Sequence, residues 1–368
     1  MNDVRAGDMG DGGSRRQIDP GFWRERRVLL TGHTGFKGAW LSLWLQSMGA
    51  QVVGFSLSEP PSEPSLYVLA RVGEGMAGSV VGDIRNAAAI GRELDRTRPE
   101  IVIHMAAQPL VRRSFAAPRE TYETNAMGTV NLLEAVRLCE EVRAVVVVTS
   151  DKCYENRESE GGYREGDPLG GHDPYSSSKA AAELVASAYR RSFFCDPSGP
   201  RVATARAGNV IGGGDWGEDR LIPDLVRAAQ AGQRLRLRNP SAVRPWQHVS
   251  CPLSGYLLLA QALCESPDYA CAWNFGPSPS DARTVEWVVR QVSGLWPGGV
   301  PWDLDDAEYP QEAARLELDS SRARKLLGWV PPLDLEAGLR ATVEWYLAWR
   351  EGKDMRELTL RQLATLAA

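Results

Sequence analysis

Residues 27–38 read RVLLTGHTGFKG, and this stretch decides the fold. Its first five residues form an apolar run that is typical of a buried β-strand. Gly32, Gly35 and Gly38 follow, so the chain can turn sharply and begin a helix. Such a turn lets backbone N–H groups approach a pyrophosphate, which predicts a dinucleotide-binding site. The alternative is an ordinary tight turn, but the position after the first strand favours the binding site.

Strand and helix patterns alternate through the first half of the chain. A helix after the turn carries its apolar residues at three-to-four spacing. We expect further strands at residues 51–55, 79–81, 101–104, 144–149 and 202–207, and helices at 87–98, 122–138 and 174–189. Buried strands that alternate with helices predict an α/β fold with a doubly wound, parallel Rossmann sheet.

The pattern changes after residue 207, where glycine and proline segments indicate loops and short elements. We expect a dinucleotide-binding domain at residues 21–207, to which the chain returns near 241–275. A smaller substrate-binding lobe should occupy mainly residues 208–350, with a C-terminal extension at 351–368. Residues 1–20 are rich in Gly, Asp and Arg, which predicts a disordered tail.

Composition excludes several classes of protein. Lys and Arg total 42 against 47 for Asp and Glu, a net charge of −5, which argues against nucleic-acid binding. No apolar stretch is long enough to span a membrane, and the N-terminus lacks the apolar core of a signal peptide. Six scattered cysteines and four scattered histidines predict neither a disulfide framework nor a metal site. We therefore expect reduced thiols in a cytoplasmic protein.

A tyrosine and a lysine supply the most informative chemical signal. Tyr175 and Lys179 are four residues apart, so they share one face of a helix. An ammonium beside a phenol should lower the tyrosine pKa toward working pH and make a base for an alcohol that loses hydride. Many helices contain this spacing by chance, but behind a dinucleotide turn it predicts redox chemistry on a hydroxyl group.

Three polar residues follow the most strongly β-branched strand. Ser150, Asp151 and Lys152 stand where the carboxyl end of a parallel strand faces ligand. Ser150 is expected to hydrogen-bond the reacting hydroxyl, and Asp151 with Lys152 to act as acid and base. The alternative for the last two is a solvated turn with an ion pair of little energetic value.

The adenosine end of the cofactor site is less well defined. A Rossmann site usually has an acidic residue after its second strand to bind the ribose. Residues 55–59 read FSLSE, so serines come first and Glu59 comes late. This leaves the ribose contact unassigned and weakens the choice of NAD over NADP. Asp83 is either an adenine contact or a helix cap, and the two interpretations are equally supported.

Longer motifs carry a resemblance over residues 22–349. The chain resembles the extended short-chain dehydrogenase/reductase superfamily and, within it, the CDP-glucose 4,6-dehydratase family. The motifs are GHTGFKG at 32–38, HMAAQP at 104–109, TSDKCY at 149–154, DPYS at 173–176, RAGNVIGGGDW at 206–216 and RPWQHV at 244–249.

The resemblance implies a three-step reaction on CDP-glucose or a related sugar nucleotide. Tyr175, helped by Lys179 and Ser150, would remove the O4 proton while C4 hydride passes to NAD. Water would then leave across C5 and C6, and hydride would return to C6, so the product is a 4-keto-6-deoxy sugar nucleotide. Asp151 would protonate the departing O6, and Lys152 would either act as the base at C5 or only polarise the C4 ketone.

The resemblance also implies the binding residues. Those for the cofactor are Gly32, Thr34, Gly35, Phe36, Lys37, Gly38, Asp83, Ile84, Ala106, Ala107, Gln108, Tyr175 and Lys179. Asn209 and Arg244 are predicted to bind the substrate pyrophosphate, although Arg244 could instead form a surface salt bridge. Arg220 and Asn274 are further candidates for substrate contact, and no residue is assigned to a metal.

Two other functions remain open. An epimerase or dehydrogenase of the same fold would share the glycine turn, Tyr175 and Lys179 but would not need Asp151 and Lys152. A noncatalytic NAD-binding scaffold is a remote alternative, because serine, tyrosine and lysine are retained together. Relatives self-associate through two long helices, here 122–138 and 174–189, so a homodimer or homotetramer is expected.

Overall fold

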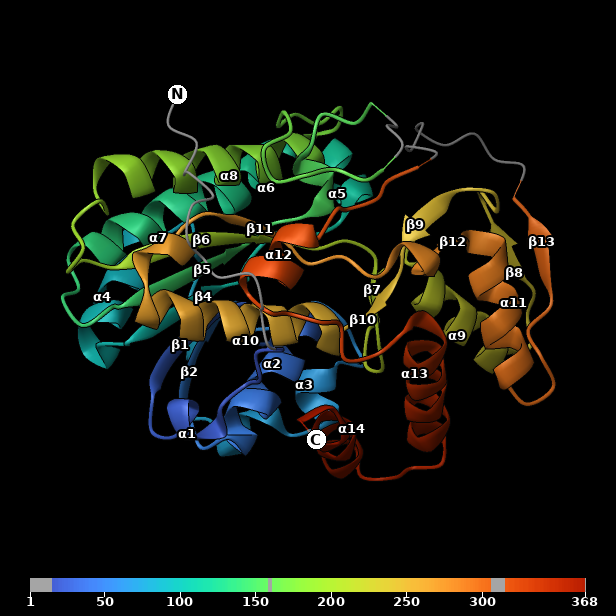
Figure 1. The fold of residues 1–368 in the computed structure, drawn as a ribbon. Helices are drawn as coiled ribbons and strands as arrows, with labels where there is room; N and C mark the ends of the chain where they lie inside the picture. Colours follow the sequence, from blue (N-terminus) through green and yellow to red (C-terminus); the bar gives the residue numbers. More distant parts are fainter. Residues whose placement is uncertain (1–14, 158–160, 306–314, 368) are drawn as a thin grey trace.

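The computed structural model describes residues 15–157, 161–305 and 315–367, and a seven-stranded parallel sheet lies at its centre (Figure 1). The strand order is β11-β6-β5-β4-β1-β2-β3. The strands are β1 (Arg27–Thr31), β2 (Gln51–Ser56), β3 (Gly78–Val81), β4 (Ile101–His104), β5 (Ala144–Val148), β6 (Arg201–Arg206) and β11 (Ala272–Asn274). This confirms the doubly wound fold.

Helices cover both faces of the sheet, as Figure 1 shows. One face carries α4 (Ala87–Thr97), α7 (Gly128–Arg137) and α8 (Pro174–Ser192), and the other carries α2 (Phe36–Ser47) and α10 (Ser250–Glu265). All five residues of β5 are buried, which explains its continuous run of apolar side chains. The β1 strand pairs with both β2 and β4, so the strand order reverses there, and ligands of doubly wound sheets bind at such a point.

A second group of short elements lies beside the main sheet (Figure 1). In it β8 (Leu235–Leu237) pairs with β13 (Trp302–Leu304), and β9 (Val243–Pro245) pairs with β12 (Ala282–Thr284). Helices α9 (Leu221–Ala231) and α11 (Val285–Leu295) pack around these strands. Between β9 and β12 the chain returns to the main sheet, where it forms α10 and β11. The proposed domain boundaries themselves stay a prediction.

The remaining elements are short or lie near the C-terminus. Helices are α1 (Pro20–Trp23), α3 (Leu66–Leu69), α5 (Val111–Ala116), α6 (Pro118–Tyr122), α12 (Ser321–Leu326), α13 (Leu335–Arg350) and α14 (Met355–Ala367). Single turns are η1 (Val72–Gly75), η2 (Glu123–Met127), η3 (Asp151–Cys153), η4 (Pro267–Tyr269) and η5 (Pro279–Asp281), and β7 (Val210–Ile211) pairs with β10 (Gln247–His248).

The helix predicted at 122–138 is confirmed, and a π-helical turn lies within it. The π-helical turn η2 separates α6 from α7. Within this turn Asn125 accepts a hydrogen bond from the Gln108 backbone N–H (2.9 Å) and donates to Ser178 (2.8 Å). π-helical turns within α-helices are frequently found at functional sites. Asn125 therefore ties the loop after β4 to the helix that carries Tyr175.

The expected tail lies partly outside the described residues, which begin at residue 15. The last part of the tail is ordered rather than disordered. The Arg16 backbone N–H donates to the Gly328 carbonyl (3.1 Å), and the Arg16 guanidinium forms an ion pair with the Glu265 carboxylate (2.7 Å). These contacts join the start of the described chain to elements near its other end.

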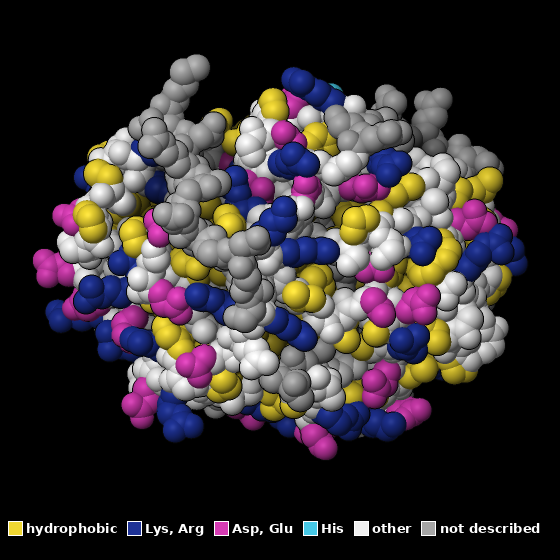
Figure 2. Space-filling model, in the orientation of Figure 1, with side chains coloured by type: hydrophobic (Ala, Val, Ile, Leu, Met, Phe, Trp, Pro, Cys, Tyr) yellow, Lys and Arg dark blue, Asp and Glu magenta, His cyan; other side chains and the backbone are white. Residues whose placement is uncertain are grey.

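The described residues also bear on the excluded classes. Among them we find no helix of the length and apolarity that a membrane crossing requires, and no cluster of His, Cys, Asp and Glu side chains suited to a metal ion. Figure 2 shows basic and acidic side chains interspersed over the visible face. That face therefore has no large area of positive charge of the kind that binds nucleic acid.

A buried ion pair joins α8 to the sheet. Glu183 lies on α8, four residues beyond Lys179, and its carboxylate contacts the Arg206 guanidinium at 2.7 Å. Both side chains are at most 3 % exposed. Glu183 also accepts hydrogen bonds from Thr149 and, at 2.7 Å, from Thr204. The two opposite charges compensate each other, and the pair with its threonine donors fixes α8 against β5 and β6.

Removal of this carboxylate should destabilise the fold strongly. We expect Glu183→Ala to lower the free energy of unfolding by about 3–5 kcal/mol, because Arg206 would stay charged and buried without the carboxylate it pairs with. The matched control is Glu286→Ala, which removes the exposed i,i+4 pair with Arg290 (2.6 Å) and should cost less than about 1 kcal/mol. Urea denaturation measures both values, and equal losses would contradict the structural role of Glu183.

Candidate active site

The glycine turn forms a tight cradle at the start of α2. Gly32 has a left-handed φ of 75°, and a Cβ there would lie 2.8 Å from the Ala106 backbone nitrogen. A Cβ at Gly38 would lie 2.2 Å from the Gly32 carbonyl oxygen. Gly35 precedes α2 without a side-chain cap on the first turn. This backbone leaves the helix N-terminus open to an anion, so the turn fits the pyrophosphate of a dinucleotide.

The polar motifs gather along one edge of the sheet. The turn at Gly32 follows β1, Ala106 and Ala107 follow β4, Ser150 follows β5, and Asn209 follows β6 shortly after its end. These four strands are neighbours in the parallel order β6-β5-β4-β1. Their carboxyl ends therefore lie side by side, so the residues that follow these strands lie along one edge of the sheet.

The catalytic candidates are positioned by local caps. Asp173 caps α8 by accepting from the Ser176 N–H (2.9 Å), and Pro174 occupies the first helical position, which sets Tyr175 in the first turn. Ser150 caps η3 and accepts from the Lys152 N–H at 3.2 Å. Ser150 lies close enough to Tyr175 to act on the pKa of the phenol, which it lowers. The structure thus brings the predicted serine and tyrosine together.

Asp151 is buried next to this pair. Its Oδ1 accepts a hydrogen bond from the Ser150 hydroxyl at 2.9 Å. Its Oδ2 is buried and has no hydrogen-bond partner among the residues that the structure describes. A Cβ at Gly208 would lie 1.7 Å from Oδ2, so only glycine allows this position of the carboxylate. Asp151 is therefore held close to Tyr175 with one oxygen left for a ligand.

The structure does not show the expected effect of Lys179 on Tyr175. Burial raises the pKa of Tyr175 to about 12, although Ser150 and the charge of Arg220 act in the opposite direction. The Lys179 ammonium donates instead to the Val148 carbonyl at 3.3 Å. Its own pKa is lowered to about 8 by burial and by the charge of Lys37. The four-residue spacing of Tyr175 and Lys179 does not reveal how deeply the phenol is buried, and this burial dominates its pKa.

Further charges of the crevice come from two residues that were assigned only to ligand binding. The pKa of the half-buried Lys37 is lowered to about 8. Burial is the main cause and the charge of Arg220 adds to it, while Asp151 and Asp215 act to raise the pKa. Arg220 donates to both oxygens of Asp215, at 2.9 and 3.0 Å. Arg220 therefore contributes positive charge near Tyr175, and Lys37 contributes it near Asp151 and Asp215.

Two assignments need correction. Asn274 is fully buried, accepts from Tyr154 (2.7 Å) and donates to the Tyr163 (2.7 Å) and Asp319 (3.1 Å) carbonyls, so its amide supports the protein interior and not a substrate. The Gln108 amide is likewise engaged, with the Leu110 backbone and Thr121 as partners. Its side chain is not available to a cofactor, which leaves only its backbone for that role.

The other predicted ligand contacts lie in different settings. Asn209 is half-buried and has a left-handed φ of 39°, directly after Gly208. Arg244 is 7 % exposed and donates to the Val243 carbonyl at 3.0 Å. Thr34 is nearly buried, while Phe36 is half-buried. The binding roles of these residues stay predictions.

The adenine candidates follow β3. Ile84 is buried, and Asn131 donates to its carbonyl at 2.9 Å. Arg85 donates to both oxygens of Asp83 through Nε and through Nη2, at 2.5–3.0 Å. This pairing holds the pKa of Asp83 below its usual range. Asp83 also accepts from the Arg85 N–H, but the helix cap of α4 is Asn86, which accepts from the Ala89 N–H at 3.1 Å. The helix-cap interpretation of Asp83 is therefore wrong, and the adenine contact stays a prediction.

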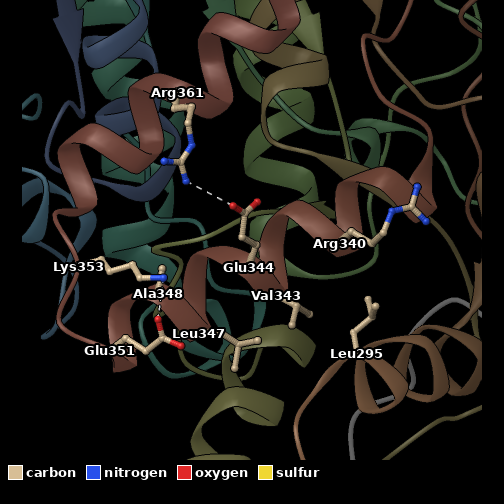
Figure 3. A pocket seen from close by; sticks show the side chains of 9 residues that line it. All are labelled: Leu295, Arg340, Val343, Glu344, Leu347, Ala348, Glu351, Lys353 and Arg361. Atoms are coloured by element: carbon tan, nitrogen blue, oxygen red, sulfur yellow. Dashed lines mark hydrogen bonds and ion pairs between the residues drawn. The ribbon is translucent and has the colours of Figure 1, made fainter.

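A hollow away from the crevice contains none of the predicted residues. It lies between α11, α13 and α14, as Figure 3 shows, and is lined by Leu295, Val343, Leu347 and several charged groups. Lys353 pairs with Glu351 (2.7 Å), and Arg361 pairs with Glu344 (3.4 Å). Because these charges compensate one another, the hollow shows no feature that selects a ligand.

Sequence reasoning missed Glu183 and the contribution of the Lys37 side chain. Glu183 continues the four-residue spacing of Tyr175 and Lys179 along α8, and this signal was visible in the sequence. Lys37 was assigned only as part of the turn. A lysine in the first turn of a helix opposes the helix dipole, which was the available signal that its charge serves a ligand.

Comparison with known proteins places these residues in a family. The family model described as GDP-mannose 4,6 dehydratase matches residues 29–342. The CDP-glucose 4,6-dehydratase of Salmonella typhimurium is 51 % identical over 352 residues, which cover 94 % of this chain and 98 % of that protein. A dTDP-glucose 4,6-dehydratase of Xanthomonas campestris is 30 % identical and covers 88 % of this chain and 95 % of its own length.

Solved structures agree with this placement. DesIV, a dTDP-glucose 4,6-dehydratase of Streptomyces venezuelae with NAD and TYD bound, has a TM-score of 0.74 and 26 % identity, and the match covers 89 % of this chain and 99 % of DesIV. The UDP-glucose 4-epimerase of Thermus thermophilus in complex with NAD has a TM-score of 0.75 and 26 % identity, with 87 % and 99 % covered. This chain therefore belongs to the GDP-mannose 4,6-dehydratase family of sugar-nucleotide dehydratases, within the short-chain dehydrogenase/reductase superfamily.

Proposed function

We propose that this chain is an NAD-dependent CDP-glucose 4,6-dehydratase, a hydro-lyase that converts CDP-D-glucose to CDP-4-keto-6-deoxy-D-glucose and water. The observation that carries the proposal is the buried Asp151 beside the Ser150–Tyr175 pair, with Lys152 next to it in the chain. The similarity to the Salmonella CDP-glucose 4,6-dehydratase along almost the whole chain supports the choice of substrate.

The chain's own groups move the protons of the first step. Ser150 orients the sugar O4, and Tyr175 removes its proton. Bound NAD supplies the hydride acceptor for C4 and returns the hydride to C6. Because burial raises the pKa of Tyr175 to about 12, positive charge must stabilise the phenolate, and Arg220 supplies part of it. Lys179 and Lys37 add charge to the same crevice.

The elimination uses the two residues after Ser150. Once C4 is a ketone, the C5 proton is acidic, and Lys152 acts as the base or polarises the ketone. The free Oδ2 of Asp151 is placed to hold the proton that O6 needs to leave as water. An epimerase of this fold has no use for such an acid. This residue therefore favours dehydration over 4-epimerisation.

Incubation with CDP-glucose tests the proposal directly. The purified protein with NAD should form a 4-keto-6-deoxy product that has lost the mass of one water, with no net accumulation of NADH. dTDP-glucose and UDP-glucose are the matched controls and should react more slowly. An isomer of unchanged mass would show an epimerase, and no reaction with any sugar nucleotide would favour a binding protein.

Tyr175→Phe should abolish turnover and spare cofactor binding. Loss of the general base should lower kcat by a factor of about 10²–10⁴. The affinity for the dinucleotide should change little, because the phenol hydroxyl contributes little to cofactor binding. The control is Tyr189→Phe in the last turn of the same helix, which should leave kcat unchanged. The alkaline absorbance of the keto sugar measures turnover, and a near-normal rate for Tyr175→Phe would remove this residue from the mechanism.

Substitutions of Lys152 should separate its two possible roles. We expect Lys152→Ala to lower dehydration by about 10²–10⁴ while C4 oxidation, followed as transient NADH absorbance in one turnover, falls less. Lys152→Arg is the matched variant, since a guanidinium keeps the charge but does not accept a proton from C5. Recovery of dehydration by arginine would show that Lys152 only polarises the ketone, and equal losses of both steps would contradict any role in elimination.

We also propose that the protein forms a homodimer or homotetramer in the cytoplasm. Exposed apolar side chains on the segment 122–138 and on α8 support the assembly; they are Tyr122, Met127, Leu138, Leu184 and Phe193. All six cysteines are free, which agrees with a reducing compartment. Light scattering gives the mass in solution, and the mass of one chain would contradict the assembly.

A further inference from the structure

The end of β2 carries no carboxylate where the adenosine ribose of a dinucleotide lies. The strand ends at Ser56, and the Gly32 N–H donates to the neighbouring Phe55 carbonyl at 2.8 Å, so this end adjoins the phosphate turn. The first acidic residue after it is Glu59, three positions later and exposed. A Rossmann site for NAD usually has an acidic residue here that accepts from the ribose hydroxyls.

A neutral pair of hydroxyls occupies this position instead. The Ser56 hydroxyl lies 2.7 Å from the Thr34 hydroxyl, and either group can donate. Thr34 belongs to the glycine turn, so the pair connects the end of β2 to the part of the turn that faces the phosphates. A hydroxyl pair can both donate and accept, whereas a carboxylate only accepts.

The groups around this pair add no uncompensated negative charge. His33 contacts the Ser79 hydroxyl at 2.8 Å, and burial lowers its pKa to about 4, so it is neutral at physiological pH. Tyr67 contacts the same serine at 3.0 Å. Asp83, at the end of the next strand, is paired with Arg85. The wall of the ribose site is therefore made of neutral side chains and one compensated carboxylate.

The proposed function removes a usual reason for strict selection between NAD and NADP, and this step of the argument rests on that function. Hydride taken from C4 returns to C6 of the same sugar, so the cofactor ends each cycle oxidised. The reaction thus draws no reducing equivalents from either nicotinamide pool. A ribose site that accepts both cofactors would not change the net reaction.

We propose that Ser56 and Thr34 form the ribose-recognition pair, and that this chain binds the 2′-phosphorylated dinucleotide almost as tightly as the unphosphorylated one. A 2′-phosphate meets hydroxyl donors at this position and no repelling carboxylate. The Kd for NADPH should lie within about tenfold of that for NADH, a small difference on the scale of binding affinities.

Titration of the full-length protein with NADH and with NADPH tests the pair, with nicotinamide fluorescence as the readout. Ser56→Asp should raise the ratio of the two Kd values, NADPH over NADH, by at least about tenfold, because the new carboxylate accepts from the ribose hydroxyls and repels a phosphate. The matched control is Ser58→Asp, which adds the same charge two residues beyond the strand and should change the ratio by less than about threefold.

Each result decides the question. A ratio above about tenfold in the wild-type protein would overturn the proposed tolerance, and a Ser56→Asp ratio no larger than that of Ser58→Asp would overturn the placement of Ser56. Binding of NADH alone would contradict this inference and leave the proposed function intact. Failure to bind either dinucleotide would contradict both.

Discussion

The desolvation of charge on α8 is the constraint on which the rest of the structure depends. Tyr175, Lys179 and Glu183 lie at four-residue intervals on the face of α8 that is turned toward the sheet, and all three are buried. Such a helix is stable only if each polar group has a partner. Arg206 satisfies Glu183, and the Val148 carbonyl receives Lys179, so the outermost of the three groups, Tyr175, is delivered to the carboxyl ends of the strands. The hydrogen bonds that anchor the helix therefore also fix the position of Tyr175.

The same desolvation shapes the electrostatics of the crevice. A buried phenol resists ionisation, and the charge of Arg220 acts to lower its pKa. Lys37 lies close enough to Lys179 for its charge to lower the pKa of that ammonium. Burial lowers the pKa of each of the two lysines to about 8, so their charge is present below that pH and is lost as the pH rises through it. A bound pyrophosphate would act in the opposite direction, because a nearby negative charge raises the pKa of an ammonium. Occupation of the cofactor site thus strengthens the charges that the phenolate requires.

The sequence predicted those features that depend on local patterns. Continuous apolar runs located β1 and β4 to the residue, and the four-residue spacing placed Tyr175 and Lys179 on one face. Features that depend on distant partners were not predictable. Asn274 looked like a substrate contact, but three segments of chain use its amide. The π turn at 123–127 depends on Gln108 and Ser178, and the pKa of Tyr175 depends on burial that no spacing reveals.

Backbone geometry, rather than a side-chain partner, leaves the candidate acid available. A hydrogen bond from Ser150 occupies one oxygen of Asp151, and the bare Cα of Gly208 makes room for the other. A larger residue at 208 would displace the carboxylate, whereas an additional donor would occupy its second oxygen. Glycine avoids both outcomes, and it does so at the end of β6, next to the strand that carries Ser150. The parallel order of the sheet therefore determines which backbone faces the acid, and in this way the fold contributes directly to the chemistry.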